Sequence, residues 1–168
     1  MSEVRSYPRR VATEAGEIEF RLMSQADEAA VLEFARKLPA HDLLFLPRDI
    51  SEPKVLAAWI KEIERGAITS LLAVKAGRVV GCGTLVRDPL SWSPHVGEIR
   101  NVVAMEVRGQ GVGRALTQEI FALALGAGLG RHAPRIGTYF THIDLSPSHE
   151  SSFGHSRLIA LAPATRLT

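Results

Sequence analysis

The most constraining feature of this sequence is a glycine-rich segment that joins an apolar stretch to an amphipathic one. The segment reads Arg108-Gly109-Gln110-Gly111-Val112-Gly113-Arg114 and follows the apolar run from Val96 to Ala104. Apolar residues then recur at helical spacing from about Val112 to Leu129. The pattern predicts a strand, a tight turn and a helix whose N-terminus opens directly from the turn.

Such a turn is well suited to holding a phosphate. The first N–H groups of a helix have no partner inside the helix, and the helix dipole makes that end positive. Glycines let the backbone approach an anion closely and permit positive φ angles, while Arg108 and Arg114 add charge suited to phosphate oxygens. We therefore expect a phosphate-bearing ligand here; the alternative is a glycine-rich turn without a ligand.

Two common classes of phosphate loop do not fit the segment. A dinucleotide fingerprint, G-x-G-x-x-G/A, needs a small last residue, but the two registers end at Arg114 and at Leu116. A nucleoside-triphosphate loop needs Lys-Ser or Lys-Thr after the glycines, and neither follows them. What remains is the pattern R-x-x-G-x-G followed by a helix.

Periodicity elsewhere in the sequence predicts an α/β protein. A helix is expected from Ser24, with Asp27 as a weak capping box, to Pro39, and a second from Ser51 to Gly66. Further strands are expected at residues 17–23, 68–74, 79–86 and 136–145. The predicted order is β-α-α-β-β-β-α-β, which favours a mixed sheet with helices packed on it.

The motif Arg108-x-x-Gly111-x-Gly113 resembles the acyl-CoA pyrophosphate signature of the GNAT N-acetyltransferase superfamily. The pattern V-x-x-x-x-R-G-x-G-x-G-R-A-L, which begins at Val103, is similar to that family too, and the order of elements agrees over roughly residues 17–130. The resemblance implies a GNAT-like fold, acetyl-CoA as cosubstrate and transfer of its acetyl group to an amine. It implies these coenzyme-binding residues: Val102, Val103, Ala104, Met105, Arg108, Gly109, Gln110, Gly111, Val112, Gly113 and Arg114.

The resemblance also implies catalytic groups on the strand before the loop. A backbone N–H near Val103 would donate to the oxyanion. Glu98, ten residues before Arg108, matches the position of a glutamate that acts as a base through water in several family members. The alternative for Glu98 is a solvent-facing residue or a partner for Arg100, and His95 is a weaker candidate for the base.

The general acid is left unassigned. The family often uses a tyrosine after its fifth strand, but this chain has only Tyr7 and Tyr139, and Tyr139 falls inside the expected strand. By resemblance, the acceptor amine is held near residues 41–49 and 90–93. Asp42 and Asp49 could attract a cationic amine, although carboxylates in loops more often cap turns.

Composition excludes several other classes of function. Residues 131–168 hold four of the 20 Lys and Arg and two of the 18 Asp and Glu, which leaves sixteen of each for residues 1–130. This balance, without a basic stripe, argues against nucleic-acid binding. No apolar run is long enough to span a membrane, and the N-terminus lacks the features of a signal peptide, so a cytoplasmic protein is expected. The lone cysteine, Cys82, is expected to be a small buried residue.

The histidines do not indicate a metal site, because those at 132, 142, 149 and 155 lack compact ligand spacing.

We expect one domain over residues 1–168 with a frayed segment at 1–15, and a homodimer would be consistent with the family. Residues 131–168 are atypical: we expect a mobile loop at 146–156 and at most a short strand or turn at 157–162. This atypical end leaves open a second function, an acyl-CoA-binding or sensing module with little or no turnover.

Overall fold

The computed structural model describes residues 5–44, 48–87, 90, 97–127, 137–138 and 156–161. Its strands form one sheet in the order β1-β2-β3-β4-β5-β7-β6. The strands are β1 (Arg9–Thr13), β2 (Gly16–Leu22), β3 (Ile68–Lys75), β4 (Arg78–Arg87), β5 (Gly97–Val103), β6 (Gly137–Thr138) and β7 (Ser156–Leu161). The helices are η1 (Gln25–Asp27), α1 (Glu28–Arg36), α2 (Ala40–Leu44), α3 (Pro53–Glu64), η2 (Met105–Val107) and α4 (Val112–Gly126).

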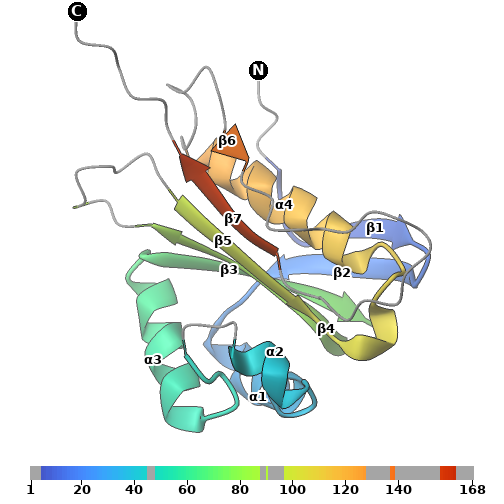
Figure 1. The fold of residues 1–168 in the computed structure, drawn as a ribbon, viewed down its shortest axis with the longest axis horizontal. Coiled ribbons are helices and arrows are strands. Elements are labelled where there is room, and N and C mark those ends of the chain that lie inside the picture. The colour runs from blue at the N-terminus through green and yellow to red at the C-terminus, as the bar shows by residue number, and fades with distance from the viewer. Residues whose placement is uncertain are drawn as a thin grey trace, which may run out of the picture.

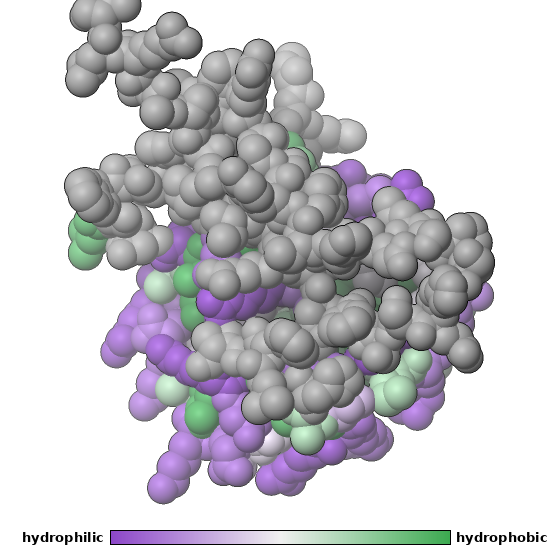
Figure 2. Space-filling model, viewed as in Figure 1, coloured by the Kyte–Doolittle hydropathy of each residue, from purple (hydrophilic) through white to green (hydrophobic). Residues whose placement is uncertain are grey.

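The sheet is covered on both faces, with α1, α2 and α3 on one side and α4 on the other (Figure 1). Each pairing between the described strands is antiparallel. The α/β class and the element order from β2 to α4 agree with the sequence prediction, within a few residues at each boundary. In Figure 2, hydrophilic side chains cover most of the described surface over α1 and α3, which are therefore amphipathic helices with one face on the sheet.

Two glycines in β4 let α4 approach the sheet closely. A Cβ added to Gly83 would lie 2.7 Å from Oδ1 of Asn101 and 3.1 Å from Cδ1 of Leu116. A Cβ added to Gly81 would lie 3.1 Å from a methyl group of Val103. Because neither glycine has a side chain, α4 and the end of β5 pack against each other over β4, and this fixes where the glycine loop emerges.

The described part of the N-terminal segment, from Arg5, is not frayed, whereas the sequence analysis expected fraying over residues 1–15. The strand β1 pairs with β2 from Arg9↔Phe20 to Thr13↔Gly16. Ahead of it, Arg5 and Tyr7 donate hydrogen bonds to the carboxylate of Glu119 on α4, over 2.6 and 3.0 Å. Burial and the Glu119 carboxylate raise the pKa of Tyr7. The attraction of three N-terminal side chains, including Arg9, to this buried carboxylate holds the segment on α4.

The C-terminal part also differs from the sequence prediction. Of the strand expected at 136–145, the structure describes only β6, and β6 lies beyond β7 at the edge of the sheet. The strand next to β5 is β7, which pairs with it from Glu98↔Ile159 to Asn101↔Ser156. A short strand was expected at 157–162 and is confirmed; the loop expected at 146–156 lies outside the described residues, apart from Ser156 in β7.

Two smaller predictions concern individual positions. Cys82 is buried as expected, and desolvation raises its pKa to about 12. The segment 41–50, expected to be a loop, instead begins with the short helix α2. Among the described residues, no helix is both long and apolar enough to cross a membrane.

Candidate functional site

The glycine loop connects β5 to α4 and leaves the N-terminus of α4 without a side-chain cap. Gly109 and Gly111 adopt the left-handed conformation, with φ of 71° and 81°, which only glycine occupies readily. Gly111 is the N-cap, and the bond from the Ala115 N–H to the Gly111 carbonyl, 3.0 Å long, belongs to the first helical turn. The preceding N–H groups, those of Val112, Gly113 and Arg114, therefore lie at the positive end of the helix.

Two glycines of the loop have few neighbours among the described residues. A Cβ added to Gly109 would meet no described atom within 4 Å, and one added to Gly111 would meet Thr13 at 4.0 Å. Arg114 in the first turn of α4 is exposed and forms no ion pair with a described residue. The glycine backbone, the N-terminus of α4 and this cation lie together at the loop, and we call this group the cradle.

The side chains of Arg108 and Gln110 both donate hydrogen bonds to backbone carbonyl groups of the protein. The Arg108 guanidinium donates to the Val103 carbonyl over 3.1 and 3.2 Å and forms an ion pair with Asp42 on α2. Gln110 donates to the Glu106 carbonyl over 2.8 Å and so closes the turn at η2. A phosphate contact from the Arg108 side chain, expected from the sequence, is not supported by this arrangement.

The end of β5 lies beside the loop. Among the described residues, β5 pairs with β7 as far as Asn101 and continues to Val103. The Ala104 N–H donates to Val80 of β4, so the backbone polar groups of Val103, one residue earlier, face the opposite edge. Val102, Val103 and Ala104 have buried side chains, and Met105 is 59% exposed. The sequence predicted this segment as a backbone contact for the coenzyme.

Glu98, the predicted base, is paired with Arg100. The Arg100 Nε and Nη2 atoms donate to the two Glu98 carboxylate oxygens over 2.8 and 2.9 Å. Glu98, Arg100 and Val102 alternate with Ile99 and Asn101 along β5, and Asn101 faces α4, where it donates to Thr117 over 2.7 Å. Glu98 therefore lies on the face of the sheet that carries α1, α2 and α3.

The remaining candidate residues either make other contacts or lie outside the described part of the chain. Asp49 accepts bonds from the N–H and hydroxyl of Ser51, over 2.9 and 2.6 Å, and these bonds lower its pKa, so it caps a turn. Tyr7 binds Glu119 on the α4 side, away from Glu98. His95, Tyr139 and residues 91–93 lie outside the described residues, and of the acceptor loop 90–93 only Leu90 is described, 95% exposed. Among the described residues, no cluster of three or more His, Cys, Asp or Glu could hold a metal ion.

A buried polar row on the same face as Glu98 was not found from the sequence. Trp59 of α3 donates from Nε1 to Ser70 of β3 over 3.1 Å, and Ser70 lies 3.4 Å from the Thr84 hydroxyl on β4. Thr84 pairs in register with Arg100. The row leads from α3 across the sheet toward Arg100. Its residues are scattered in the sequence, so only the register of the sheet reveals it.

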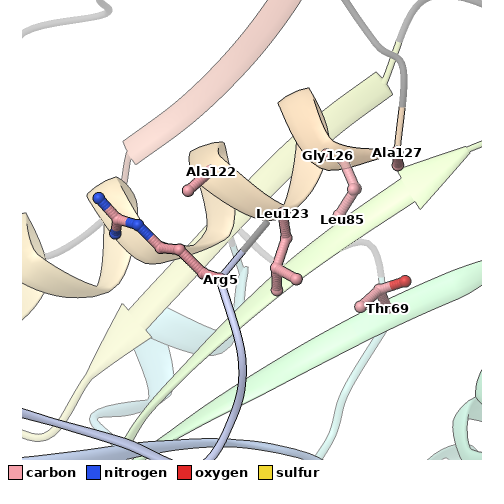
Figure 3. Close-up of a pocket in the computed structure, with 7 residues that line it drawn as sticks. All are labelled: Arg5, Thr69, Leu85, Ala122, Leu123, Gly126 and Ala127. Carbon is pink, nitrogen blue, oxygen red and sulfur yellow. The ribbon is translucent and has the colours of Figure 1, made fainter. Parts of the chain in front are cut away.

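One apolar hollow is far from the glycine loop. It has a volume of about 200 Å³ and is lined by Arg5, Thr69, Leu85, Ala122, Leu123, Gly126 and Ala127. Figure 3 shows Arg5 and the last turns of α4 around it. The helix rises 1.5 Å per residue, so Ala122 lies about 15 Å along α4 from the cradle. The hollow is thus separate from the residues gathered at the loop.

Comparisons with known proteins agree with this geometry. The sequence model of the acetyltransferase (GNAT) family matches residues 30–139. No curated protein sequence matches the chain. Among solved structures, the GNAT domain of PAT from S. lividans is similar, with 17% identity and a TM-score of 0.66, covering 92% of this chain and 98% of that one.

Two further structures show the same fold. An acetyltransferase of the GNAT family from Streptococcus pneumoniae has 16% identity and a TM-score of 0.58, covering 87% of this chain and 99% of that one. The PaiA N-acetyltransferase from Thermoplasma acidophilum, solved in complex with coenzyme A, has 20% identity and a TM-score of 0.54, covering 67% and 74%. At these identities the structures establish the fold alone.

Proposed function

The chain belongs to the acetyltransferase (GNAT) family, and we propose that it transfers an acetyl group from acetyl-CoA to a primary amine of a small molecule or protein. The observation that carries the proposal is the N-terminus of α4, which begins at the left-handed Gly111 and has no side-chain cap among the described residues. In this proposal the N–H groups of Val112, Gly113 and Arg114 hold the pyrophosphate, and the exposed Arg114 guanidinium adds charge. The PaiA structure, a coenzyme A complex of the same fold, is consistent with this role.

The end of β5 supplies the next part of the proposed site. The bound coenzyme provides a thioester whose carbonyl carbon the amine attacks. The Val103 N–H faces the edge of β5 opposite β4, where it can donate to the pantetheine arm or to the oxygen that becomes negative. Because a backbone N–H in a buried strand is held in place, it stabilises that charge without reorganisation.

Glu98 is proposed as the base. An amine reaches the site largely as ammonium and must lose a proton before it can attack. Glu98 can accept that proton through a water molecule, and its pair with Arg100 holds the carboxylate in place. Its place on the face of α1, α2 and α3 puts it on the side where, by family resemblance, the acceptor is held.

A second function is an acyl-CoA-binding or sensing module with little or no turnover. The observation that favours it is the position of β7, which occupies the place next to β5 where the sequence predicted strand 136–145. The cradle for the pyrophosphate is present in both functions. The two differ only in whether the acyl group is transferred.

An assay of acetyl transfer separates these functions. Purified protein would be mixed with acetyl-CoA and a panel of amino acids, polyamines and peptides with free N-termini, and release of the thiol would be followed. Amine-dependent thiol release supports the transferase. Binding of acetyl-CoA by calorimetry without release for any amine would favour the sensing module, and absence of binding would contradict both.

A further inference from the structure

Arg108 occupies the first position of the R-x-x-G-x-G motif, yet its side chain is held by other parts of the protein. Its guanidinium binds the Val103 carbonyl through Nε and Nη2, and Nη2 also binds the Asp42 carboxylate. The Arg108 side chain is 17% exposed and that of Asp42 is 0% exposed. The ion pair is therefore shielded from solvent, and ionic strength has little influence on it.

The pair joins three elements that are distant in the sequence. Asp42 lies on α2, the short helix on the acceptor side of the sheet, 66 residues before Arg108. Val103 ends β5, just beyond the last described pair between β5 and β7. Arg108 itself belongs to the turn that opens α4. One guanidinium therefore links α2 to the end of β5 and to the turn before α4.

We propose that Arg108 and Asp42 are a positioning pair that couples the acceptor-side helix α2 to the coenzyme site by fixing the peptide group of Val103. This proposal rests on the proposed function. The Val103 carbonyl, held by Arg108, belongs to the same residue whose N–H is proposed to meet the thioester. Phosphate contacts at the loop are then made by the α4 backbone and Arg114, and Arg108 acts through Val103.

A phosphate ligand and a positioning residue leave different kinetic signatures. If Arg108 bound phosphate, Arg108→Gln would weaken coenzyme A binding, and Asp42→Asn would not weaken it, because the arginine would be released toward the phosphate. If the two residues position Val103, both substitutions should lower kcat with an amine substrate by similar factors, about 10–100-fold, the range expected when a supporting group is lost. The Kd for coenzyme A should change less than about threefold.

The experiment uses Asp42→Asn, Arg108→Gln and the double variant, with Arg114→Gln as the matched control in the same loop. The double variant removes both charges of the pair, so its kcat should fall no further than that of either single variant. Arg114→Gln should lower coenzyme A affinity about tenfold, which the Asp42 and Arg108 variants should not do. Arg108→Lys, which keeps the charge but not the forked geometry, should restore kcat only in part.

Hydrogen exchange of the unmodified protein tests the coupling independently of how the variants fold. Coenzyme A binding should raise the protection of amides in α2 (residues 40–44) as well as in the first turn of α4. Protection confined to the loop, or Arg108→Gln losing affinity tenfold while Asp42→Asn does not, would overturn the positioning pair. If the wild-type protein shows no affinity for coenzyme A, it is the proposed function that fails.

Discussion

The sequence predicted which residues form this site but not where their side chains bind. The motif predicted which residues form the loop, because glycine spacing and helix periodicity are local properties. It did not predict that Arg108 binds Asp42, because Asp42 lies 66 residues away and the pairing depends on the position of α2. Glu98 was identified by its place before the loop, and its pairing with Arg100 was one of the two alternatives considered.

The role of Glu98 can be tested by removing its charge alone. Glu98→Gln keeps the shape of the side chain but cannot accept the proton of the incoming ammonium. We expect kcat to fall about 10²–10⁴-fold at neutral pH, the range for a positioned base, with the Kd for acetyl-CoA unchanged. Stopped-time assays across pH 6–9 measure this. The exposed Glu64, changed to Gln, serves as the control, and a wild-type rate for Glu98→Gln at every pH would remove Glu98 from the mechanism.

Among the secondary-structure elements, the most regular were predicted best. The helices α3 and α4 and the strands β3, β4 and β5 have long apolar patterns, because each buries one face or both against the rest of the core. By contrast, β1 is an edge strand that is mostly exposed, and α2 has five residues, too few to show a helical period. The pairs Arg9–Glu119 and Arg108–Asp42, which help to hold β1 and α2, join residues distant in sequence that local patterns do not connect.

The start of the first helical segment provides a pH-dependent test of an element. Asp27 accepts hydrogen bonds from the Ser24 N–H, over 2.9 Å, and from Arg21, over 2.6 Å. Burial opposes its ionisation, but the bonds from Arg21 and Ser24 outweigh burial and lower the pKa of Asp27. A carboxylate with a lowered pKa stabilises the fold above its unfolded pKa, about 3.9, and this contribution is lost as the pH falls through the folded value.

We therefore expect Asp27→Asn to lower the free energy of unfolding by about 1–2 kcal/mol at pH 7. Below about pH 4 the difference from the wild type should shrink, since the wild-type Asp27 becomes protonated. Urea denaturation at pH 7 and pH 3.5 measures both values. Glu14→Gln, in the exposed β1–β2 turn, is the control. An equal loss of stability at the two pH values would show that the charge of Asp27 is not what matters.

At the scale of the whole molecule, one core connects the elements from β1 to α4. Buried apolar side chains run from Ile18 and Phe20 on β2 through Leu71 on β3 to Leu116 and Ile120 on α4. The Glu119 contacts add the N-terminal segment to this body. Because these elements share one core, we propose that they form a single domain and unfold together.

A single cooperative transition is expected on denaturation. In Trp92→Phe, fluorescence reports Trp59 alone, whose indole binds Ser70 beneath α3, while far-UV circular dichroism reports all elements. The two probes should give the same midpoint in urea, as two-state unfolding requires. A fluorescence transition well separated from the circular dichroism transition would show that the α1–α3 side unfolds independently of the rest, and would contradict the single domain.

The central claim, that the loop before α4 holds the pyrophosphate of an acyl-CoA, is tested most directly by calorimetric titration with acetyl-CoA. The two variants to compare with wild type are Gly111→Glu and Gly77→Glu. Both glycines have positive φ, 81° and 76°, so both substitutions impose similar backbone strain and add the same charge. Only Gly111 caps α4; Gly77 lies in the β3–β4 hairpin.

The account predicts that the wild type and Gly77→Glu bind acetyl-CoA with the same affinity. In Gly111→Glu, a carboxylate occupies the place of the anion and removes at least two charge-assisted hydrogen bonds. The affinity should therefore fall by a factor of about 100 or more while the protein remains folded. Equal affinity in Gly111→Glu and Gly77→Glu would contradict the account.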